Sequence, residues 1–167
     1  MYLSSPKTTW SSECQREMSA IRSACGNALQ LHHIDSTAVA GLYAKDCLYI
    51  LGVTPDLAAL IDQHQPLKTL GYEFRGEYGL PGRAYYHKAR RKVHLHIYQA
   101  GHPSIKPHLR FVAAMNRDPA LRAELNQLKL ALHNPYPDDK AQYQAAKAHF
   151  YQQFSTPSTH DNNPTHL

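Results

Sequence analysis

The fold of this chain is decided by residues 33–51, which read HIDSTAVAGLYAKDCLYIL. This stretch predicts a strand ending at Ile34, a tight polar turn that begins at Asp35, a short helix and a second strand. The second strand, Cys47–Val53, is almost continuous in apolar residues, which is typical of a central strand covered on both faces. Backbone N–H groups converge at a polar turn between a strand and a helix, so an anion can bind there. The stretch therefore indicates an α/β (α+β) domain with an anion-binding turn near its centre.

One helix is predicted ahead of this stretch. Residues 1–10 resemble a loosely held arm, and Ser12 with Gln15 three positions later forms a capping-box pattern that would start a helix. Apolar side chains at steps of three and four extend this helix to about Ala28. The first strand of the domain is then expected at Leu29–Ile34.

A helix and three strands are predicted after the second strand. Asp56 can cap the helix, Pro66 should break or offset it, and Gly71 suits the position just past its end. The strand-like runs alternate with turn residues and so predict an antiparallel meander. These runs are Tyr72–Tyr78, Arg83–Lys88 and Val93–Gln99.

The C-terminal third is predicted to be helical. We expect one helix over about Lys106–Asn116, a second after Asp118 with that residue as its N-cap, and a third from Asp138 or Asp139 to about Phe154. Residues 155–167 are rich in Ser, Thr, Pro, Asn and His and lack apolar periodicity. The chain is therefore expected to form one domain over residues 1–154, followed by a disordered tail over residues 155–167.

The composition permits an anionic partner but does not indicate which kind of anion binds. The formal charge is +5 and there are twelve histidines, which suits phosphates, acidic metabolites or nucleic acid. The one dense basic run, residues 87–92, is better explained as a solvated hairpin tip, so we do not expect nucleic-acid binding. No apolar run approaches the roughly 18 residues of a membrane span. We therefore expect a cytoplasmic protein with no membrane partner, and the pattern leaves the oligomeric state open.

Several separate blocks of the chain resemble the GrpB family, a branch of the nucleotidyltransferase-like fold. Residues 33–51 are similar to a family signature that usually reads H-[IV]-G-S-T-A-V-P-G-L-x-A-K-P-x-x-D-[IVL]-D. Further blocks follow in family order between about Leu31 and Phe150. They are Leu70–Tyr72, Gly79–Tyr86, His94–Ile97, His108–Phe111, Leu128–Lys129 and Tyr143–Phe150. The resemblance implies a nucleotidyltransferase-like mixed sheet flanked by helices.

The chain departs from the family pattern at chemically important positions. Alignment on Lys45 places Tyr49 and Leu51 where the family carries two carboxylates, the hard oxygen ligands that Mg²⁺ requires. Asp35 replaces a turn glycine, and its bulk and negative charge oppose a polyphosphate. A block that reads F-R-D in the family is Phe111–Ala113 here, without the arginine and the aspartate. We therefore do not expect Mg²⁺, or any other cofactor, to be required.

The remaining polar residues of these blocks are expected to line one concave face. Histidine would act as general acid or base near its natural pKa, an aspartate would orient it, and Arg or Lys would hold an anion. The candidate catalytic residues are His33, Asp35, Asp46, His94 and His96. The candidate substrate-binding residues are Ser36, Thr37, Lys45, Tyr49, Arg83, His108, Lys129, Tyr143 and Lys147.

Two functions are compatible with this set. The one we favour is a metal-independent enzyme of transferase or cyclase type that acts on a small anionic or carboxylate substrate. The other is a non-catalytic module that binds a nucleotide, another ligand or a partner, and a Mg²⁺-dependent nucleotidyltransferase ranks below both. His94 and His96 alternate on one strand face and could share a transition metal, although hydrogen-bonded structural imidazoles explain the pair more simply.

Overall fold

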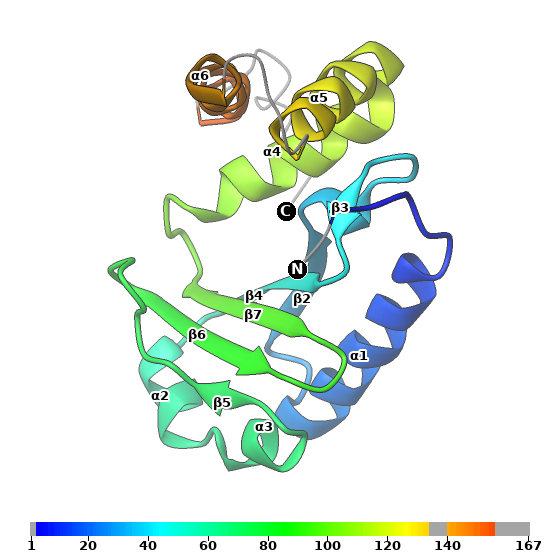
Figure 1. Ribbon diagram of the computed structural model, residues 1–167. Helices are drawn as coiled ribbons and strands as arrows, with labels where there is room; N and C mark the ends of the chain where they lie inside the picture. The colour runs from blue at the N-terminus through cyan, green and yellow to red at the C-terminus, as the bar shows by residue number, and fades with distance from the viewer. Residues whose placement is uncertain (1–2, 134–139, 156–167) are drawn as a thin grey trace.

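A five-stranded mixed sheet forms the centre of the computed structural model, which describes residues 3–133 and 140–155 (Figure 1). The strand order is β2-β4-β7-β6-β5. β4 pairs in parallel with β7, and the other neighbours pair antiparallel. The strands are β2 Gln30–Ile34, β4 Leu48–Thr54, β5 Glu73–Phe74, β6 Arg83–Lys88 and β7 Val93–Gln99.

The predicted central strand is confirmed as β4. It lies between β2 and β7 and is buried on both faces. A 3₁₀ turn at Ser36–Ala38 follows β2, and two short helices, α2 at Leu57–Asp62 and α3 at Gln65–Thr69, follow β4. The antiparallel meander β5-β6-β7 is also confirmed, although β5 is shorter than predicted because Gly76 takes a φ of +63° and ends the extended backbone.

One face of the sheet packs against α1 (Trp10–Cys25), α2 and α3 (Figure 1). Leu48 and Ile50 of β4 point into this layer, and α1 contributes Trp10 and Ile21. Each of these side chains is at most 2% exposed. Burial of this apolar surface provides most of the driving force that holds α1 against the sheet.

The opposite face is covered by α4 (Ile105–Arg117), with α5 (Pro119–Leu132) and α6 (Lys140–Gln152) stacked beyond it (Figure 1). Leu51 of β4 packs in this second layer with residues of α4. A third apolar cluster joins the C-terminal helices to the segment after the 3₁₀ turn. Its buried members are Val39, Leu42, Phe111, Met115, Leu125, Phe150 and Phe154.

The N-terminal arm is fixed, which corrects the prediction of a loosely held segment. β1 (Leu3–Ser4) pairs with β3 (Ala44–Lys45). The helix α1 begins at Trp10, two residues before the predicted capping box, and the Ser12 hydroxyl donates to the Thr9 carbonyl at 3.0 Å. The arm is held because Trp10 is buried and its indole N–H donates to Asp46 Oδ1 at 2.8 Å.

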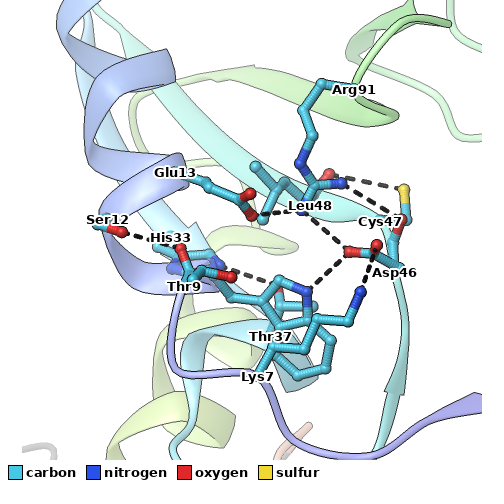
Figure 2. A network of polar contacts seen from close by, with 11 residues as sticks. Lys7, Thr9, Ser12, Glu13, His33, Thr37, Asp46, Cys47, Leu48 and Arg91 are labelled. Atoms are coloured by element: carbon cyan, nitrogen blue, oxygen red, sulfur yellow. Dashed lines mark hydrogen bonds and ion pairs between the residues drawn. The ribbon is translucent and has the colours of Figure 1, made fainter.

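The basic hairpin between β6 and β7 is also docked, which corrects the prediction of a solvated tip. Figure 2 shows Arg91 reaching Glu13 on α1 and Asp46 after β3, with distances of 2.8 and 3.0 Å to the carboxylate oxygens. Lys88 donates to Glu17 at 2.7 Å. The run is held because acidic side chains of α1 face it, while Arg90 remains exposed.

Most predicted helix boundaries are confirmed. Asp56 accepts from the Ala59 N–H at 3.1 Å, Asp118 caps α5, and Pro66 lies in the first turn of α3, which separates that helix from α2. Gly71 follows α3 with a φ of +100°. Asp138, Asp139 and the tail from residue 156 lie outside the described residues. Of the helices that the structure describes, none combines the length and apolar character needed to cross a membrane.

Candidate functional site

A cavity of about 200 Å³ lies where the polar turn after β2 meets β3, the start of β4, α5 and α6. It is formed between segments far apart in the sequence, and β1 closes one side through Leu3. Seven of the sequence-predicted site residues line it. They are Asp35, Ser36, Thr37, Lys45, Tyr49, Lys129 and Lys147.

The turn at the base of the cavity is held in a conformation suited to glycine. Asp35 has a φ of 63° and a ψ of −165°, a region that is essentially restricted to glycine and costs other residues about 1–3 kcal/mol. The Ala38 N–H donates to the Asp35 carbonyl at 3.0 Å and so closes the following 3₁₀ turn. The turn therefore has a backbone shape that suits glycine and carries a carboxylate in it.

Lys129 brings a buried ammonium group to this turn from α5. Its side chain is 6% exposed, and Nζ donates to Ser36 Oγ and, at 2.8 Å, to the Tyr43 carbonyl. Burial, and then the nearby charge of Lys147, lower the pKa of Lys129 to about 8, while Asp35 acts in the opposite direction. The ammonium therefore loses its proton much more readily than an exposed lysine does.

Asp35 is the carboxylate among the three lysines of the cavity. Burial raises its pKa, and the charges of His108, Lys129 and Lys147 oppose that rise. Burial, followed by the charge of Lys45, lowers the pKa of Lys147. The cavity lining thus includes one carboxylate and three lysines, of which Lys129 is buried, Lys147 half-buried and Lys45 exposed. The net charge of these four groups is positive whenever the lysines are protonated.

His108 on α4 extends this group toward the sheet. Burial lowers its pKa, and the charge of Asp35 opposes that effect. Its ring is stacked near that of His96, with centroids 6.4 Å apart. His108 therefore lies between the cavity and a second set of polar residues on β6 and β7.

This second set is a row of rings across three strands. Tyr49 of β4 is stacked on His94 of β7, with centroids 4.9 Å apart and planes 10° apart. Tyr85 of β6 lies 5.6 Å from His94, contacts its Nδ1 through the phenol oxygen, and is itself stacked on Tyr78 at 5.0 Å. Burial, and then the charges of His87, Lys92 and Arg75, lower the pKa of His94 to about 4, so its imidazole is neutral at pH 7.

Arg83 and His96 are engaged with each other in this row. Arg83 donates to His96 Nδ1 at 3.2 Å, and also to the carbonyl oxygens of Tyr78 at 2.8 Å and Glu77 at 3.2 Å. Burial, and then the charge of Arg83, lower the pKa of His96 to about 3. The Arg83 guanidinium is therefore committed to the loop and to the imidazole, and it does not line the cavity.

Three sequence-predicted residues lie elsewhere. His33 pairs with Ile50 in the sheet, which places its side chain on the α1 face, and its Nε2 contacts Thr37 Oγ1 at 2.9 Å (Figure 2). Asp46 binds Lys7, Trp10 and Arg91 in the network of Figure 2. Tyr143 is half-buried on α6, outside the cavity lining. Strand alternation separates His33 from His94 and His96.

The cavity also includes residues that the sequence reasoning missed. His133 and Tyr151 follow Lys129 and Lys147 by four positions each, and residues four apart share a helix face. That spacing is a signal that would have found them. Burial, followed by the charge of Asp35, raises the pKa of Tyr151 to about 12. Leu3, Ala44 and Cys47 complete the lining, and Leu3 carries no local signal because only the pairing of β1 with β3 brings it there.

The side chains at the family's two carboxylate positions do not fit Mg²⁺. Leu51 is fully buried in an apolar cluster with Ile34 and Tyr98. Burial raises the pKa of the Tyr49 phenol, so it does not supply an anionic oxygen. Asp35 alone remains as a hard anionic ligand in the cavity lining. Over residues 3–133 and 140–155, no three His, Cys, Asp or Glu side chains are close enough to hold a metal ion.

The chain matches known proteins along most of its length. The model of the family described as GrpB protein matches residues 1–156. The UPF0157 protein SCO7215 of Streptomyces coelicolor is 30% identical over 146 residues, which cover 87% of this chain and 77% of that protein. The UPF0157 protein YqkA of Bacillus subtilis is 32% identical over 117 residues. That match covers 69% of this chain and 34% of YqkA, so the chain spans about a third of that relative.

Solved structures give the same answer for the fold. The crystal structure of the conserved protein GrpB from Enterococcus faecalis superposes with a TM-score of 0.80 at 25% identity, covering 92% of this chain and 97% of that one. The Cid1 poly(U) polymerase with bound MgGTP superposes with a TM-score of 0.58 at 9% identity, covering 77% of this chain and 44% of that one, a likeness of fold alone. The chain belongs to the GrpB family and has a nucleotidyltransferase-like fold.

Proposed function

We propose that this protein binds a small carboxylate or phosphate compound in the cavity and moves a proton on it without a metal ion, in the cytoplasm. The observation that carries the proposal is the buried Lys129 ammonium, which shares the cavity with Lys45 and Lys147 and with one carboxylate, Asp35. A buried cation, Lys129, and a half-buried one, Lys147, beside a single carboxylate are costly unless a further opposite charge joins them. A bound anion would supply that charge.

The size of the cavity limits the ligand. A volume of about 200 Å³ holds a small metabolite or one end of a larger one. Ser36 lines the cavity beside the lysines, and hydroxyl and ammonium groups are donors that carboxylate and phosphate oxygens accept from. A small anion fits this donor set better than a polymer does.

Proton transfer is assigned to Asp35 and Lys129. The pKa of Lys129 is about 8 and that of Asp35 is raised, and acid–base catalysis is most efficient when the pKa lies near the working pH. His94 and His96 have a pKa of about 4 and about 3 and are weak bases at neutral pH. We therefore move the acid–base role from the imidazoles to the cavity pair, with His108 beside Asp35 as a further proton carrier.

The second candidate function is binding without catalysis. It is favoured by the hydrogen bonds that Arg83 donates to His96 and to the Tyr78 carbonyl. These bonds make the two side chains part of a fixed scaffold. The three free cysteines are compatible with a reduced compartment under either function.

Calorimetric titration tests anion binding. Inorganic phosphate and malonate should bind to the wild type equally well in Mg²⁺ and in EDTA. Lys147→Gln should weaken both by about tenfold or more, because it removes one cation from a desolvated site. Lys106→Gln is the matched control, because it removes the same charge from an exposed position on α4. Binding that requires Mg²⁺, or that survives Lys147→Gln unchanged, would contradict the proposal.

Deuterium exchange separates the two functions. The wild type is incubated in D₂O with a panel of small carboxylates and phosphates, and incorporation at carbon and any product are followed by mass spectrometry. Under the proposed function, a compound that binds exchanges or reacts with the wild type, and Asp35→Asn abolishes the reaction while the compound still binds. Binding with neither exchange nor product would support the non-catalytic module.

A further inference from the structure

Ser36 and Lys129 form a hydrogen-bonded pair in the wall of the cavity. Lys129 Nζ donates to Ser36 Oγ, and both residues line the cavity. Ser36 is 8% exposed and Lys129 is 6% exposed, so bulk water competes little for this contact. A serine hydroxyl is a weak nucleophile until a neighbouring base takes its proton, and lysine is the base in one group of hydrolases. The pair therefore has the composition of a nucleophile and its base.

A third group orients the lysine. Lys129 Nζ also donates to the carbonyl oxygen of Tyr43 at 2.8 Å. A neutral amine has two N–H donors and one lone pair, so Lys129 can keep the bond to Tyr43 while its lone pair accepts the proton of Ser36. Because the pKa of Lys129 is lowered to about 8 by burial and then by the charge of Lys147, about half of these amines are neutral at pH 8. Nucleophile, base and orienting group are thus all present.

Ser36 directly follows the strained backbone of Asp35. β2 ends at Ile34, Asp35 has a φ of 63° and a ψ of −165°, and the 3₁₀ turn begins at Ser36. Strained backbone of this kind persists only where the surrounding structure holds it, and it is concentrated at active sites. A sharp turn between a strand and a helix also carries the nucleophile of the α/β-hydrolases. A hydrogen bond that only tied α5 to this turn would not require such strain.

We propose that Ser36 is a nucleophile, with Lys129 as its base, in acyl transfer from a small acyl compound that carries a phosphate or carboxylate group. The inference rests on the proposed function, because the anionic group of the substrate is assigned to Lys45 and Lys147, which line the same cavity. It adds the substrate class, an acyl phosphate or a charged ester. It also changes Ser36 from a substrate-binding residue to a catalytic one.

The reaction has two steps. In the first, Lys129 takes the hydroxyl proton of Ser36, Oγ bonds to the acyl carbon, and the bond from that carbon to the leaving oxygen breaks. Lys129 then gives the proton to the leaving group. In the second step, Lys129 takes a proton from water, the water oxygen attacks the acyl carbon on Ser36, and the proton returns to Oγ. The sum is hydrolysis of the acyl compound to an acid and a phosphate or alcohol.

Acetyl phosphate is the probe for the first step. After brief incubation with the wild type at pH 8 and an acid quench, peptide mass mapping should find an acetyl group on Ser36. Released phosphate is followed in parallel, so that a short-lived acetyl-enzyme is detected as turnover. The rate at low acetyl phosphate concentration should rise with pH and level off above about pH 8. Inorganic phosphate should slow the reaction by competing for the lysines.

Two variants separate catalysis from binding. Ser36→Ala should abolish the adduct and the turnover, yet bind inorganic phosphate within about tenfold of the wild type, because it loses one hydrogen bond. Lys129→Arg keeps the charge but cannot act as a base, and it should slow acetylation by at least about a hundredfold. Ser12→Ala is the matched control, because it removes a hydroxyl from an exposed position on α1 and should change neither rate nor affinity.

The outcomes distinguish this inference from the function on which it rests. If phosphate binds but Ser36 gains no acetyl group and no turnover occurs, or if Ser36→Ala retains the turnover, the nucleophile is wrong and the anion site stands. A phosphoryl group on Ser36 in place of an acetyl group would overturn acyl transfer. If inorganic phosphate does not bind to the wild type, the proposed function fails first. The position of the adduct on the wild type decides the matter even if Ser36→Ala does not fold.

Discussion

Lys129 Nζ donates a 2.8 Å hydrogen bond to the carbonyl oxygen of Tyr43, a residue 86 positions earlier in the chain. The same ammonium donates to Ser36 Oγ. These two bonds tie α5 to the polar turn and to the segment before β3, and they place a buried cation where the sheet meets the C-terminal helices. The site therefore depends on a contact that neither part of the chain could make alone.

The buried ammonium predicts a rise of stability with pH. The pKa of Lys129 is about 8 in the folded protein and 10.5 when unperturbed, so between these values the unfolded chain binds more protons and folding is favoured as pH increases. Between pH 8 and pH 9.5 this contribution amounts to about 2 kcal/mol. Urea denaturation across this range should show the rise in the wild type and its loss in Lys129→Met.

Lys106→Met is the control for that series, because Lys106 is exposed on the neighbouring helix α4. It should follow the wild type within about 0.5 kcal/mol at each pH. A slope in Lys129→Met equal to that of the wild type would mean that another group is responsible. A saturating anion should also reduce the slope, because it raises the pKa of Lys129.

The backbone strain at Asp35 predicts a difference in stability between two uncharged replacements. Asp35→Gly removes side-chain strain at a φ of 63° and should be about 1–2 kcal/mol more stable than Asp35→Asn, after allowance for the greater freedom of glycine in the unfolded chain. Asp35→Asn removes the charge and keeps a side chain, so the difference between the two variants isolates the backbone effect. Guanidinium denaturation at pH 7 measures both, and an Asp35→Gly protein less stable than Asp35→Asn would contradict the strain.

The docked hairpin predicts that replacing Arg91 destabilises the fold much more than replacing the adjacent Arg90. Arg91→Met breaks charged hydrogen bonds to Glu13 and Asp46 and should cost about 1–3 kcal/mol. Arg90→Met makes the same chemical change at an exposed position and should cost less than about 0.5 kcal/mol. Thermal and urea unfolding of the two variants would show the contrast, and equal losses would mean that the network of Figure 2 contributes little.

His94 predicts a loss of stability in mild acid. Its pKa is about 4 in the folded protein against 6.5 when unperturbed. The unfolded chain therefore gains a proton first as pH falls from 6.5 to 4, and stability decreases through that range. His94→Gln should flatten this part of the curve, whereas His149→Gln, at an exposed position on α6, should leave it unchanged. Proton NMR titration of the His94 ring provides the direct check, since a midpoint near 6.5 would remove the basis of the prediction.

Local signals in the sequence were sufficient for most of the fold. The apolar run of β4, the cap residues Asp56 and Asp118, and the break at Pro66 each act through neighbouring backbone groups, so they determine an element wherever it lies in space. The family blocks were enough to indicate the family, which the match over residues 1–156 confirms, and its mixed sheet, which the strand order and the superposition on the GrpB crystal structure confirm.

The tertiary structure decided which polar residues meet. His33 and His94 lie on opposite faces of the sheet because the register of β2 against β4 sets the direction of each side chain. Asp46 is drawn to Trp10 and Arg91 because those groups reach it from α1 and from the hairpin.

The family, most of the strands and helices, and seven of the residues that line the cavity follow from the order of the amino acids. That Asp35, Lys129 and Lys147 share one cavity, and that Arg83 does not line it, follows from how distant elements pack together. The two kinds of information differ in range. Hydrogen bonds within an element are fixed by nearby residues, whereas the packing of α5 and α6 against the turn depends on apolar contacts from the whole chain.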